Sequence, residues 1–445
     1  MKLWRLRLSG IVRRRRPVTL VLWGYAFYVA CGFALLCLPF AHERAGLAWL
    51  DHLFTATSAV STTGLVSISP SGSYSFFGEL IILGLIQLGG IGYMTLGSFV
   101  MLALRHRLNA VHRGVTRSAF VLPRDMNIAA FIRAVIVFTL AIEFVGALLL
   151  TLFFARAGTP DALWNGVFHS VSAFCTAGFS LFDTSLEAYR ANAGIVLVVA
   201  ALSYLGAIGF IVMSDWWRWV ARRRAPSLTS RIILRVTFWL AVIGTVSIAL
   251  TDAHLAQMAW PERLLAAFFQ VMTAMTTVGF DTVPIANLGS ASILLLLVAM
   301  VMGASPSGTG GGIKSTTVAI FYGAVRGALA GRETVRLLGQ TISSRRIHMA
   351  MAATGFYIGT LVVGMAALML VEDQDFAMLM FESASAIGTV GLSLGATAEL
   401  SVAGKWIVIA MMFVGRLGPI TVGVALFPRA DDDRTPNRAA ADLAV

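Results

Sequence analysis

Long runs of apolar residues constrain this chain more than any other feature. A membrane-spanning helix needs about 20 apolar residues to cross a hydrocarbon core of about 30 Å. Eight such runs lie at approximately residues 18–40, 78–104, 128–154, 194–217, 230–250, 290–325, 349–371 and 404–427. Only 13% of the 445 residues are charged, whereas a soluble protein carries about a quarter. The pattern predicts an all-α membrane protein with eight spanning helices.

Three other kinds of feature are not expected here. The first apolar run is too long for a signal peptide and no small-residue cleavage site follows it, so we expect a retained helix. Cys31, Cys37 and Cys175 lie in apolar or turn-like segments and indicate no disulfide framework. The seven histidines are scattered without metal-ligand spacing.

The distribution of basic residues predicts the orientation in the membrane. Of the 34 Lys and Arg residues, 28 lie before the first apolar run, in alternate loops, or after the last run. Five lie in the other loops, namely Arg44, Arg156, Arg190, Arg263 and Lys405. Because basic loops stay cytoplasmic, we expect both termini inside, in a bacterial inner membrane. Orientation explains the net charge of +12 without a nucleic-acid partner.

A short stretch recurs four times between the long runs. In every copy a Phe precedes a glycine by ten positions, with Ser or Thr at minus six, Ala at minus five and Thr at minus two. The copies are FTATSAVSTTGLVS (54–67), FHSVSAFCTAGFSL (168–181), FQVMTAMTTVGFDT (269–282) and FESASAIGTVGLSL (381–394). A small-residue packing face could explain one copy, but four in register indicate four repeats of a helix, a short helix with a loop, and a second helix.

The second helices also repeat, with one interruption. QLGGIGY (87–93), YLGAIGF (204–210) and VGRLGPI (414–420) share a Gly-x-x-Gly pattern. The third copy begins alike at Gly303 but continues as SPSGTGGGIKSTT (305–317), which cannot remain helical. We therefore expect only the third copy to interrupt its second helix, with a loop at 304–314.

The repeats define the organisation of the chain. A basic N-terminus (1–17) and a C-terminal tail (428–445) flank them, both cytoplasmic. The four repeats are predicted at 18–104, 128–217, 230–325 and 349–427.

The four Thr-x-Gly turns predict a cation path. Non-helical backbone inside a bilayer must be buried or line a water-filled cavity. Carbonyl oxygens of four turns around one axis can replace the hydration shell of a monovalent cation, and glycine permits the close approach. The predicted filter residues are Thr62, Thr63, Gly64, Thr176, Ala177, Gly178, Thr277, Val278, Gly279, Thr389, Val390 and Gly391. A divalent ion would favour carboxylates, and these turns have none. Asp281 is expected at the outer mouth, as a cation-attracting vestibule residue or an ordinary solvated charge.

From about residue 18 to 427 the chain resembles the Trk/Ktr/HKT superfamily of potassium transporters, and most of all its KtrB-type membrane subunits. The most specific matches are SAIGTVGLSLG (385–395) and GASPSGTGGGIKSTT (303–317). The resemblance implies a potassium-uptake pore in a homodimer, gated by a cytoplasmic KtrA-like ring that binds ATP, ADP or NAD. It implies K⁺ as the transported ion, Na⁺ as a coupling or activating ion, and no cofactor on this chain. The third turn, TTVGFD, and Thr176 in the second depart from common family strings and leave the choice between K⁺ and Na⁺ open.

The resemblance also suggests a gate below the filter. A charge in the centre of a spanning helix is unfavourable by several kcal/mol, so we expect Arg416 to face the pore or the broken-helix loop. A purely structural pairing of Arg416 with Glu143 or loop carbonyls is the alternative. The expected gate residues are Gly308, Gly310, Gly311, Gly312, Lys314 and Arg416. In this view glycine gives the loop hinge freedom, and Lys314 extends to lipid headgroups or water.

Three other functions are alternatives to a potassium pore. A sodium-coupled or sodium-selective transporter on the same scaffold is the nearest alternative. A receptor or scaffold without transport would have no use for costly non-helical backbone. An enzyme is disfavoured because no base, nucleophile or metal cluster converges. The string GTGGGIKS (308–315) has Ile313 where a phosphate loop needs glycine, and no strand precedes it.

Overall fold

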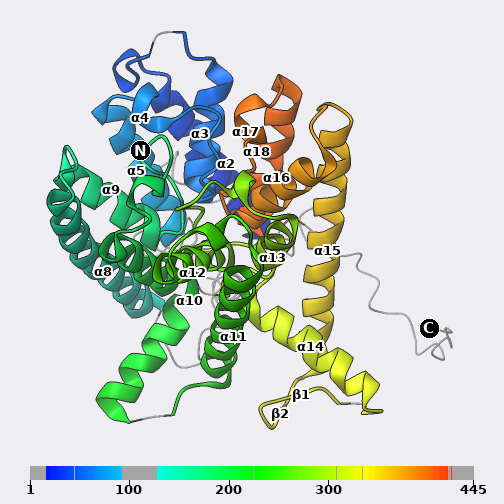
Figure 1. Cartoon of the computed structure of the whole chain (residues 1–445). Helices are drawn as coiled ribbons and strands as arrows, with labels where there is room; N and C mark the ends of the chain where they lie inside the picture. Colours follow the sequence, from blue (N-terminus) through cyan, green and yellow to red (C-terminus); the bar gives the residue numbers. More distant parts are fainter. Residues whose placement is uncertain are drawn as a thin grey trace, which may run out of the picture.

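The part of the chain that the structure describes folds into helices joined by turns and one small hairpin (Figure 1). This computed structural model describes residues 17–44, 46–92, 128–223, 225–306, 308–332, 334–418 and Val422. The helices that lie in the apolar runs of the sequence are α2 (Pro17–Leu36), α5 (Phe76–Ile91), α8 (Ile128–Arg156), α10 (Ala193–Arg222), α11 (Leu228–Thr251), α13 (Ser290–Val301), α14 (Ser315–Leu329), α15 (Ser344–Met369) and α18 (Val402–Leu417).

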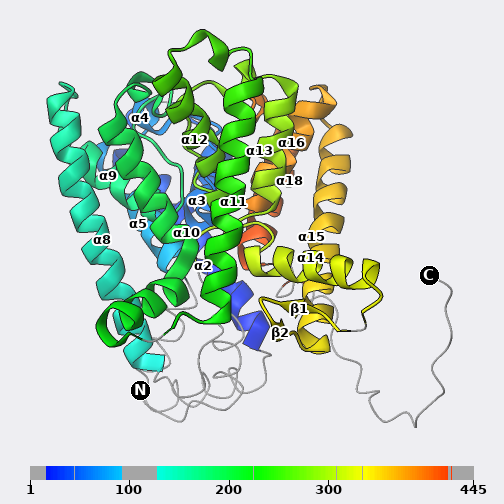
Figure 2. The ribbon, with the colours of Figure 1, turned by 60° about the horizontal axis from the view of Figure 1, so that its bottom comes forward.

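The outer surface of these helices is apolar. Phe144 on α8 is 64% exposed, Leu250 on α11 is 63% exposed and Val363 on α15 is 69% exposed. Figure 2 shows α8, α11 and α15 running in roughly the same direction around the outside of the molecule. Such extensive apolar exposure would promote association in water, and it suits a lipid surrounding.

Length and composition alone identify fewer spans than the sequence predicts. Among the described residues, three helices are long and apolar enough to cross a membrane: Arg133–Arg156, Leu228–Thr251 and Ser344–Met369. The two parts of α10 would make a fourth if they count as one span. Residues 93–104 and, apart from Val422, 419–427 of the predicted second and eighth spans lie outside the described residues.

Four further helices, of 13 to 17 residues, occupy the centre. They are α3 (Trp49–Ser61), α9 (Ala162–Phe174), α12 (Trp260–Thr276) and α16 (Phe376–Gly388), and we call them the central helices. Each contacts the second helix of the preceding repeat, in the pairs α9 with α5, α12 with α10, α16 with α13, and α3 with α18. The last pair closes the circle between the first and fourth repeats. The centre is also rich in buried hydroxyls, which is the reverse of the apolar outer surface.

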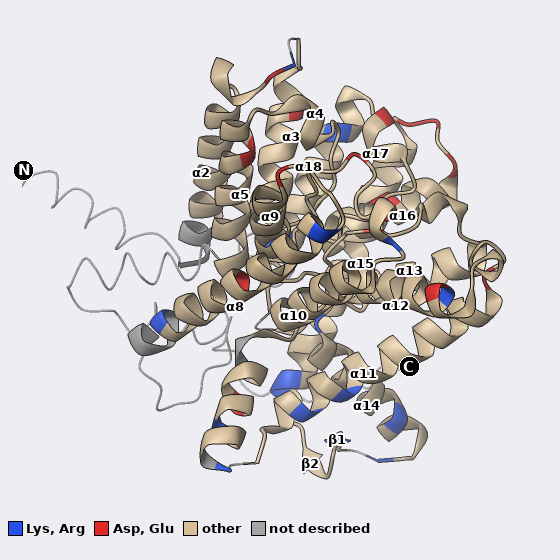
Figure 3. Ribbon diagram, turned by 60° about the vertical axis from the view of Figure 1, so that its left-hand side comes forward, with Lys and Arg blue, Asp and Glu red and all other residues tan. Residues whose placement is uncertain are grey.

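Smaller elements connect these layers. They are η1 (Pro39–Ala41), α4 (Pro70–Ser73), η2 (Glu187–Tyr189), η3 (Leu255–Gln257), η4 (Ile285–Asn287), α17 (Ala396–Glu399), β1 (Arg336–Leu337) and β2 (Gln340–Thr341). The antiparallel hairpin pairs Arg336 with Thr341. In Figure 3, basic residues of α14 and of the adjoining ends of α10 and α11 lie at the end of the molecule that carries this hairpin.

The expectation that only the third copy interrupts its second helix is wrong. The third copy does break, between Val301 at the end of α13 and Ser315 at the start of α14. However, Gly209 inside α10 has non-helical dihedrals, with φ 79° and ψ 170°. The glycines that end α5 and α18 are similar, with φ 89° and ψ 129° at Gly92 and φ 81° and ψ 142° at Gly418. These are the second glycines of the three Gly-x-x-Gly patterns, and glycine tolerates this conformation where other residues do not.

Candidate functional site

Each central helix ends in the same left-handed turn. The residue after the helix, or one residue further in α9, is a threonine with positive φ: 49° at Thr62, 51° at Thr176, 57° at Thr277 and 48° at Thr389. Left-handed caps are usually glycine, and a β-branched residue there is strained by about 1–3 kcal/mol. Four strained threonines at equivalent positions mark a site whose geometry is fixed by its surroundings.

The repeated Ala and Ser/Thr columns of the sequence build this turn. The threonine N–H donates to the carbonyl of the alanine three residues earlier, at 3.1–3.3 Å in all four copies. The next N–H donates to the carbonyl of the Ser or Thr five residues earlier, at 2.8–3.1 Å. In the first and fourth copies the serine hydroxyl also accepts from the glycine N–H, in the pairs Ser58 with Gly64 (3.1 Å) and Ser385 with Gly391 (3.0 Å). These amides therefore face away from the turn.

The four glycines close a ring. A Cβ placed on Gly64 would lie 2.5 Å from the Ala177 carbonyl oxygen. The corresponding distances are 2.2 Å from Gly178 to Val278, 2.3 Å from Gly279 to Val390, and 2.2 Å from Gly391 back to Thr63. The four turns thus touch one another in cyclic order. We call residues 62–64, 176–178, 277–279 and 389–391 the turn ring.

The turn ring has the chemistry of a site for a dehydrated monovalent cation. Its threonines and its Ala177, Val278 and Val390 are buried, and it contains no acidic side chain. The C-terminal ends of four helices meet there, and their partial negative charge favours a cation. Backbone carbonyls are the ligands that can substitute for the hydration shell of such an ion.

The broken-helix loop, residues 302–314, packs directly against the turn ring. The Gly311 N–H donates to the Thr277 hydroxyl at 2.9 Å. The hydroxyl of Thr309 lies 3.1 Å from that of Thr176 and 3.2 Å from the Phe174 carbonyl, to which it donates. Thr309 is the one threonine among the loop glycines, and its role was not predicted from the sequence.

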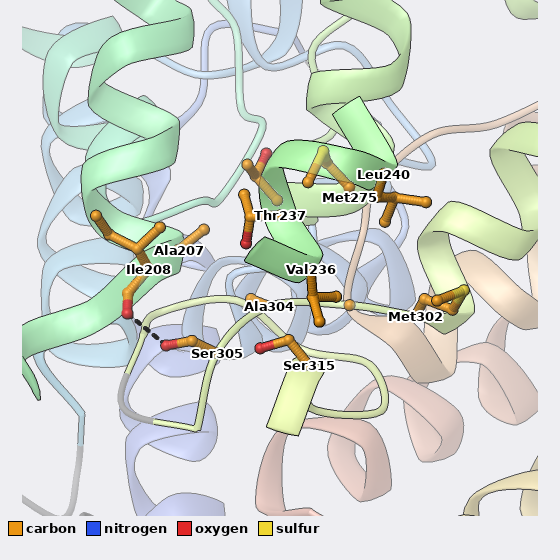
Figure 4. Close-up of a pocket in the computed structure, with 12 residues that line it drawn as sticks. Ala207, Ile208, Val236, Thr237, Leu240, Met275, Met302, Ala304, Ser305 and Ser315 are labelled. Carbon is orange, nitrogen blue, oxygen red and sulfur yellow. Dashed lines mark hydrogen bonds between the residues drawn. The ribbon is translucent and has the colours of Figure 1, made fainter. Parts of the chain in front are cut away.

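The loop is also bonded to the broken part of α10. Amides of Ser305 and Thr309 donate to the carbonyls of Ala207 and Gly206, both at 3.1 Å. The Ser305 hydroxyl donates to the Ile208 carbonyl at 2.5 Å, the contact drawn in Figure 4. Because the break at Gly209 frees carbonyls in the last turn before it, α10 can accept these bonds.

Three of the loop glycines are required for close packing, a role that the sequence did not predict. A Cβ would lie 2.1 Å from the Ala207 carbonyl oxygen at Gly308, 2.5 Å from the Thr277 hydroxyl at Gly310, and 2.1 Å from the Gly388 carbonyl oxygen at Gly311. Of these loop glycines, Gly312 alone has a positive φ, +67°.

Arg416 contacts the loop, an arrangement that fits both the expected gate position and its alternative, a structural pairing with loop carbonyls. Its guanidinium donates to the carbonyl of Thr309 in the loop and to that of Gly89 in α5. Glu143, the other partner that this alternative names, accepts from the Gln87 amide at 2.8 Å. The arginine therefore links the fourth repeat to the loop and to the first repeat.

The expectation that Lys314 extends to headgroups or water is wrong. Its ammonium group donates to the Gly310 carbonyl at 2.6 Å and to the Gly311 carbonyl at 3.3 Å. These carbonyls belong to the loop itself and are left without a helical partner by the break, so the lysine satisfies them locally.

Asp281 lies beside the third turn, half-buried at the join between the second and third repeats. Its N–H donates to the Ser185 hydroxyl at 3.2 Å, and its carbonyl accepts from Leu186 at 3.0 Å. Burial raises the pKa of the Asp281 carboxyl to about 7, and the negative charge of Glu187 adds to this while the Ser185 hydroxyl opposes it. Unlike a solvated loop charge, this carboxyl therefore titrates near neutrality.

Comparison with known proteins agrees with this architecture. The family model described as TrkH, cation transport protein, matches residues 32–431. The Ktr system potassium uptake protein B of Bacillus subtilis is 31% identical over 413 residues, covering 92% of each chain. The protein of the same name from Vibrio alginolyticus is 33% identical over 398 residues, covering 88% of this chain and 87% of the relative.

Two further relatives extend the comparison. The potassium/sodium uptake protein NtpJ of Enterococcus hirae is 30% identical over 429 residues, covering 94% of each chain. The crystal structure of the potassium transporter TrkH from Vibrio parahaemolyticus superposes with a TM-score of 0.74 at 21% identity, covering 93% of this chain and 86% of that chain. The predicted helical membrane architecture and the resemblance seen in the sequence are thereby confirmed, and the family consists of transporters and not of enzymes. This chain is a membrane protein of the TrkH family of cation transport proteins.

Proposed function

We propose that this chain is the pore-forming subunit of a potassium-uptake system. In this proposal four helix–pore-loop–helix repeats and eight spanning helices surround one axis, with the turn ring as the selectivity filter. The observation that carries it is the cyclic contact of the four glycines, Gly64 to Gly178 to Gly279 to Gly391 and back. Ordinary helix packing does not require four non-helical turns to meet in a closed circle.

Potassium would cross by exchanging water for carbonyl oxygens in the turn ring. Outward-facing amides, bonded to the central helices, leave the carbonyls free to bind the ion. A membrane potential supplies about 2.3 kcal/mol per charge at 100 mV, so inward movement needs no chemical step.

The loop at 302–314 and Arg416 would form the gate below the filter. The loop bonds to α9, α10 and Thr277, and the positive charge of Arg416 would oppose a cation in a site of low dielectric constant. The space beside the loop, lined by residues of α10, α11 and α12 and by the loop itself, has a volume of about 10 Å³, room for about one water molecule. Figure 4 places Ser305 and Ser315 at this space. Opening would therefore require α10 or α11 to move as well.

A cytoplasmic partner would supply that movement. Two similar proteins are named Ktr system potassium uptake protein B, which supports a partner within such a system. We infer that this partner is a KtrA-like ring that binds ATP, ADP or NAD. We further propose a homodimer with both termini cytoplasmic, and Asp281 as a vestibule residue that draws cations to the mouth.

A sodium-coupled or sodium-selective transporter is the second candidate. The third turn places Asp281 two residues after Gly279, and a relative of similar identity is named as a potassium/sodium uptake protein. Growth of a potassium-uptake-deficient bacterium at low K⁺ tests the main proposal. Expression of this chain with a Ktr-type regulatory subunit should restore growth, and sodium uptake without any potassium uptake would favour the second candidate.

A further inference from the structure

A second set of polar side chains lies behind the turn ring. Each central helix carries a polar residue directly after its repeated phenylalanine, nine positions before the ring glycine. These residues are Thr55, His169, Gln270 and Glu382, each with an exposed fraction of 0%. We call them the polar belt. Full burial of a polar group is unfavourable unless it is hydrogen-bonded, so their partners indicate what they do.

In the second and third repeats the hydrogen-bond partners lie in the segment that directly follows the turn ring. His169 Nδ1 lies 2.8 Å from the Asn165 carbonyl and donates to it. Full burial without an anionic partner favours the neutral ring, in which Nε2 accepts from the Ser180 hydroxyl at 3.0 Å. In the third repeat the amide oxygen of Gln270 faces this segment and accepts from the N–H groups of Thr282 (3.0 Å) and Val283 (3.1 Å).

Glu382 makes the largest set of bonds. One carboxyl oxygen accepts from the Ser393 hydroxyl and from the Leu394 N–H at 3.1 Å. The other accepts from the Thr397 hydroxyl at 2.6 Å. The Ser393 hydroxyl already accepts from the Gly395 N–H at 2.9 Å, so it donates to Glu382. All these partners are donors, which is the environment of a carboxylate.

In the first repeat the acceptor for the segment after the turn ring lies one helical turn earlier, at Asp51. Thr55 is short, and Asp51, four residues before it on the same helix face, accepts from the Ser67 hydroxyl at 2.8 Å. Lys405 forms an ion pair with Asp51 at 2.7 Å. The negative charge of Asp51 is thus balanced, whereas no ion pair to Glu382 occurs within the described ranges.

Hydrogen-bond acceptors of the polar belt keep the N–H and O–H donors of these segments turned away from the centre of the turn ring. We propose that the polar belt positions the segments that follow the turn ring. We further propose that Glu382 is a fixed negative charge that sets the affinity of the turn ring for K⁺. Both statements rest on the proposed cation pore. Thr55, neutral His169 and Gln270 carry no charge, so Glu382 is the anionic member of the belt. Glu382 is a positioning residue, because it bonds Ser393 and Leu394 and does not itself bind the ion.

The near-symmetry of the repeats gives a direct test of charge against bracing. Titration of the purified full chain with KCl and NaCl by calorimetry gives both affinities. Glu382→Gln keeps the shape and one accepting oxygen, and should weaken K⁺ binding about tenfold, the effect of one partly screened charge. The double variant Glu382→Gln with Gln270→Glu returns the charge to the belt in another repeat. It should restore the K⁺ affinity to within about threefold.

Controls separate this inference from general damage. Glu372→Gln removes a carboxylate that accepts the same kinds of bonds from Ser401 at the start of α18, and should leave affinity unchanged. If Glu382→Gln does not fold, Gln270→Glu alone remains informative and should raise the K⁺ affinity. An unchanged affinity in Glu382→Gln or Gln270→Glu, or a double variant as weak as Glu382→Gln, would overturn the inference. Absence of K⁺ binding and uptake by the unmodified chain would instead overturn the proposed function.

Discussion

Arg416 donates a hydrogen bond to the carbonyl oxygen of Thr309, which joins a charged side chain in α18 to the loop that interrupts the third repeat. The same guanidinium reaches the Gly89 carbonyl in α5. Thr309 in turn bonds the Phe174 carbonyl of the second repeat. Arg416 therefore contributes to holding the loop where it contacts the turn ring. The proposed gate is fixed by hydrogen bonds in this conformation.

Replacing Arg416 by alanine should open this gate. The change removes a positive charge and two donors, so potassium uptake into vesicles should rise about tenfold and depend less on the cytoplasmic regulator. Deleting residues 308–312 should act in the same direction, and the two changes together should be less than additive because they disrupt one barrier. Uptake that falls in all three variants, at normal expression, would mean that arginine and loop only hold the fold together.

Thr309→Val tests the loop without removing charge. The substitution keeps the side-chain shape but loses the hydroxyl bonds to Phe174 and Thr176, which should loosen the closed state by about 1–3 kcal/mol. We expect higher uptake in the absence of the regulator and little change in its presence. Thr360→Val on α15 is the matched control, because its hydroxyl bonds only within its own helix at the Phe356 carbonyl. Equal effects of the two variants would contradict a role for Thr309 in the gate.

Uptake at low potassium should depend on pH through Asp281. Because its pKa is raised to about 7, the carboxyl is mostly ionised at pH 8 and mostly neutral at pH 6, so the attraction for K⁺ weakens as the pH falls. The apparent KM for K⁺ should therefore rise between pH 8 and 6, and Asp281→Asn should flatten the profile at the weaker value. Asp183→Asn is the control, since donation from Ser69 and Ser71 lowers the pKa of Asp183 and keeps it ionised throughout. A profile that Asp281→Asn does not alter would exclude this residue as the titrating group.

The first glycines of the Gly-x-x-Gly patterns should be intolerant of any side chain. A Cβ on Gly206 would lie 1.9 Å from the Phe174 carbonyl oxygen, and one on Gly89 would lie 2.1 Å from that of Val60. Gly206→Ala should destabilise the protein by about 1–3 kcal/mol or more through overpacking. Gly359→Ala on α15 meets no atom within 4 Å and should be neutral or slightly stabilising. Thermal unfolding in detergent measures both, and equal melting temperatures would contradict the packing described.

Periodicity and repetition predicted much of this molecule from sequence. The four short stretches became four central helices because their Ala and Ser/Thr columns supply the acceptors of one shared turn. The break after Gly303 followed from its glycines and proline. Arg416 bonds to the carbonyls of Thr309 and Gly89, as expected of a charge at that depth, which needs polar partners.

Other features depend on contacts between distant segments and were missed. Nothing local distinguishes Gly209, which breaks α10, from Gly206 three residues earlier, which packs on Phe174. The folding of Lys314 onto Gly310 depends on the path of the loop. The four residues of the polar belt share a position in the repeat but no residue type. They can be recognised as a set only from the structure, in which His169, Gln270 and Glu382 contact equivalent segments after the turn ring.

The central claim is that the turn ring selects the ion, and competition uptake tests it most directly. Uptake of K⁺ in the presence of excess Na⁺ should be compared for the unmodified chain and for serine at each of Gly64, Gly178, Gly279 and Gly391. Gly395→Asn is the control, since Gly395 has a φ of +102° but meets no atom within 4 Å. The account predicts that each ring variant loses discrimination between K⁺ and Na⁺ while the control retains it. Folded ring variants that all keep the selectivity of the unmodified chain would contradict it.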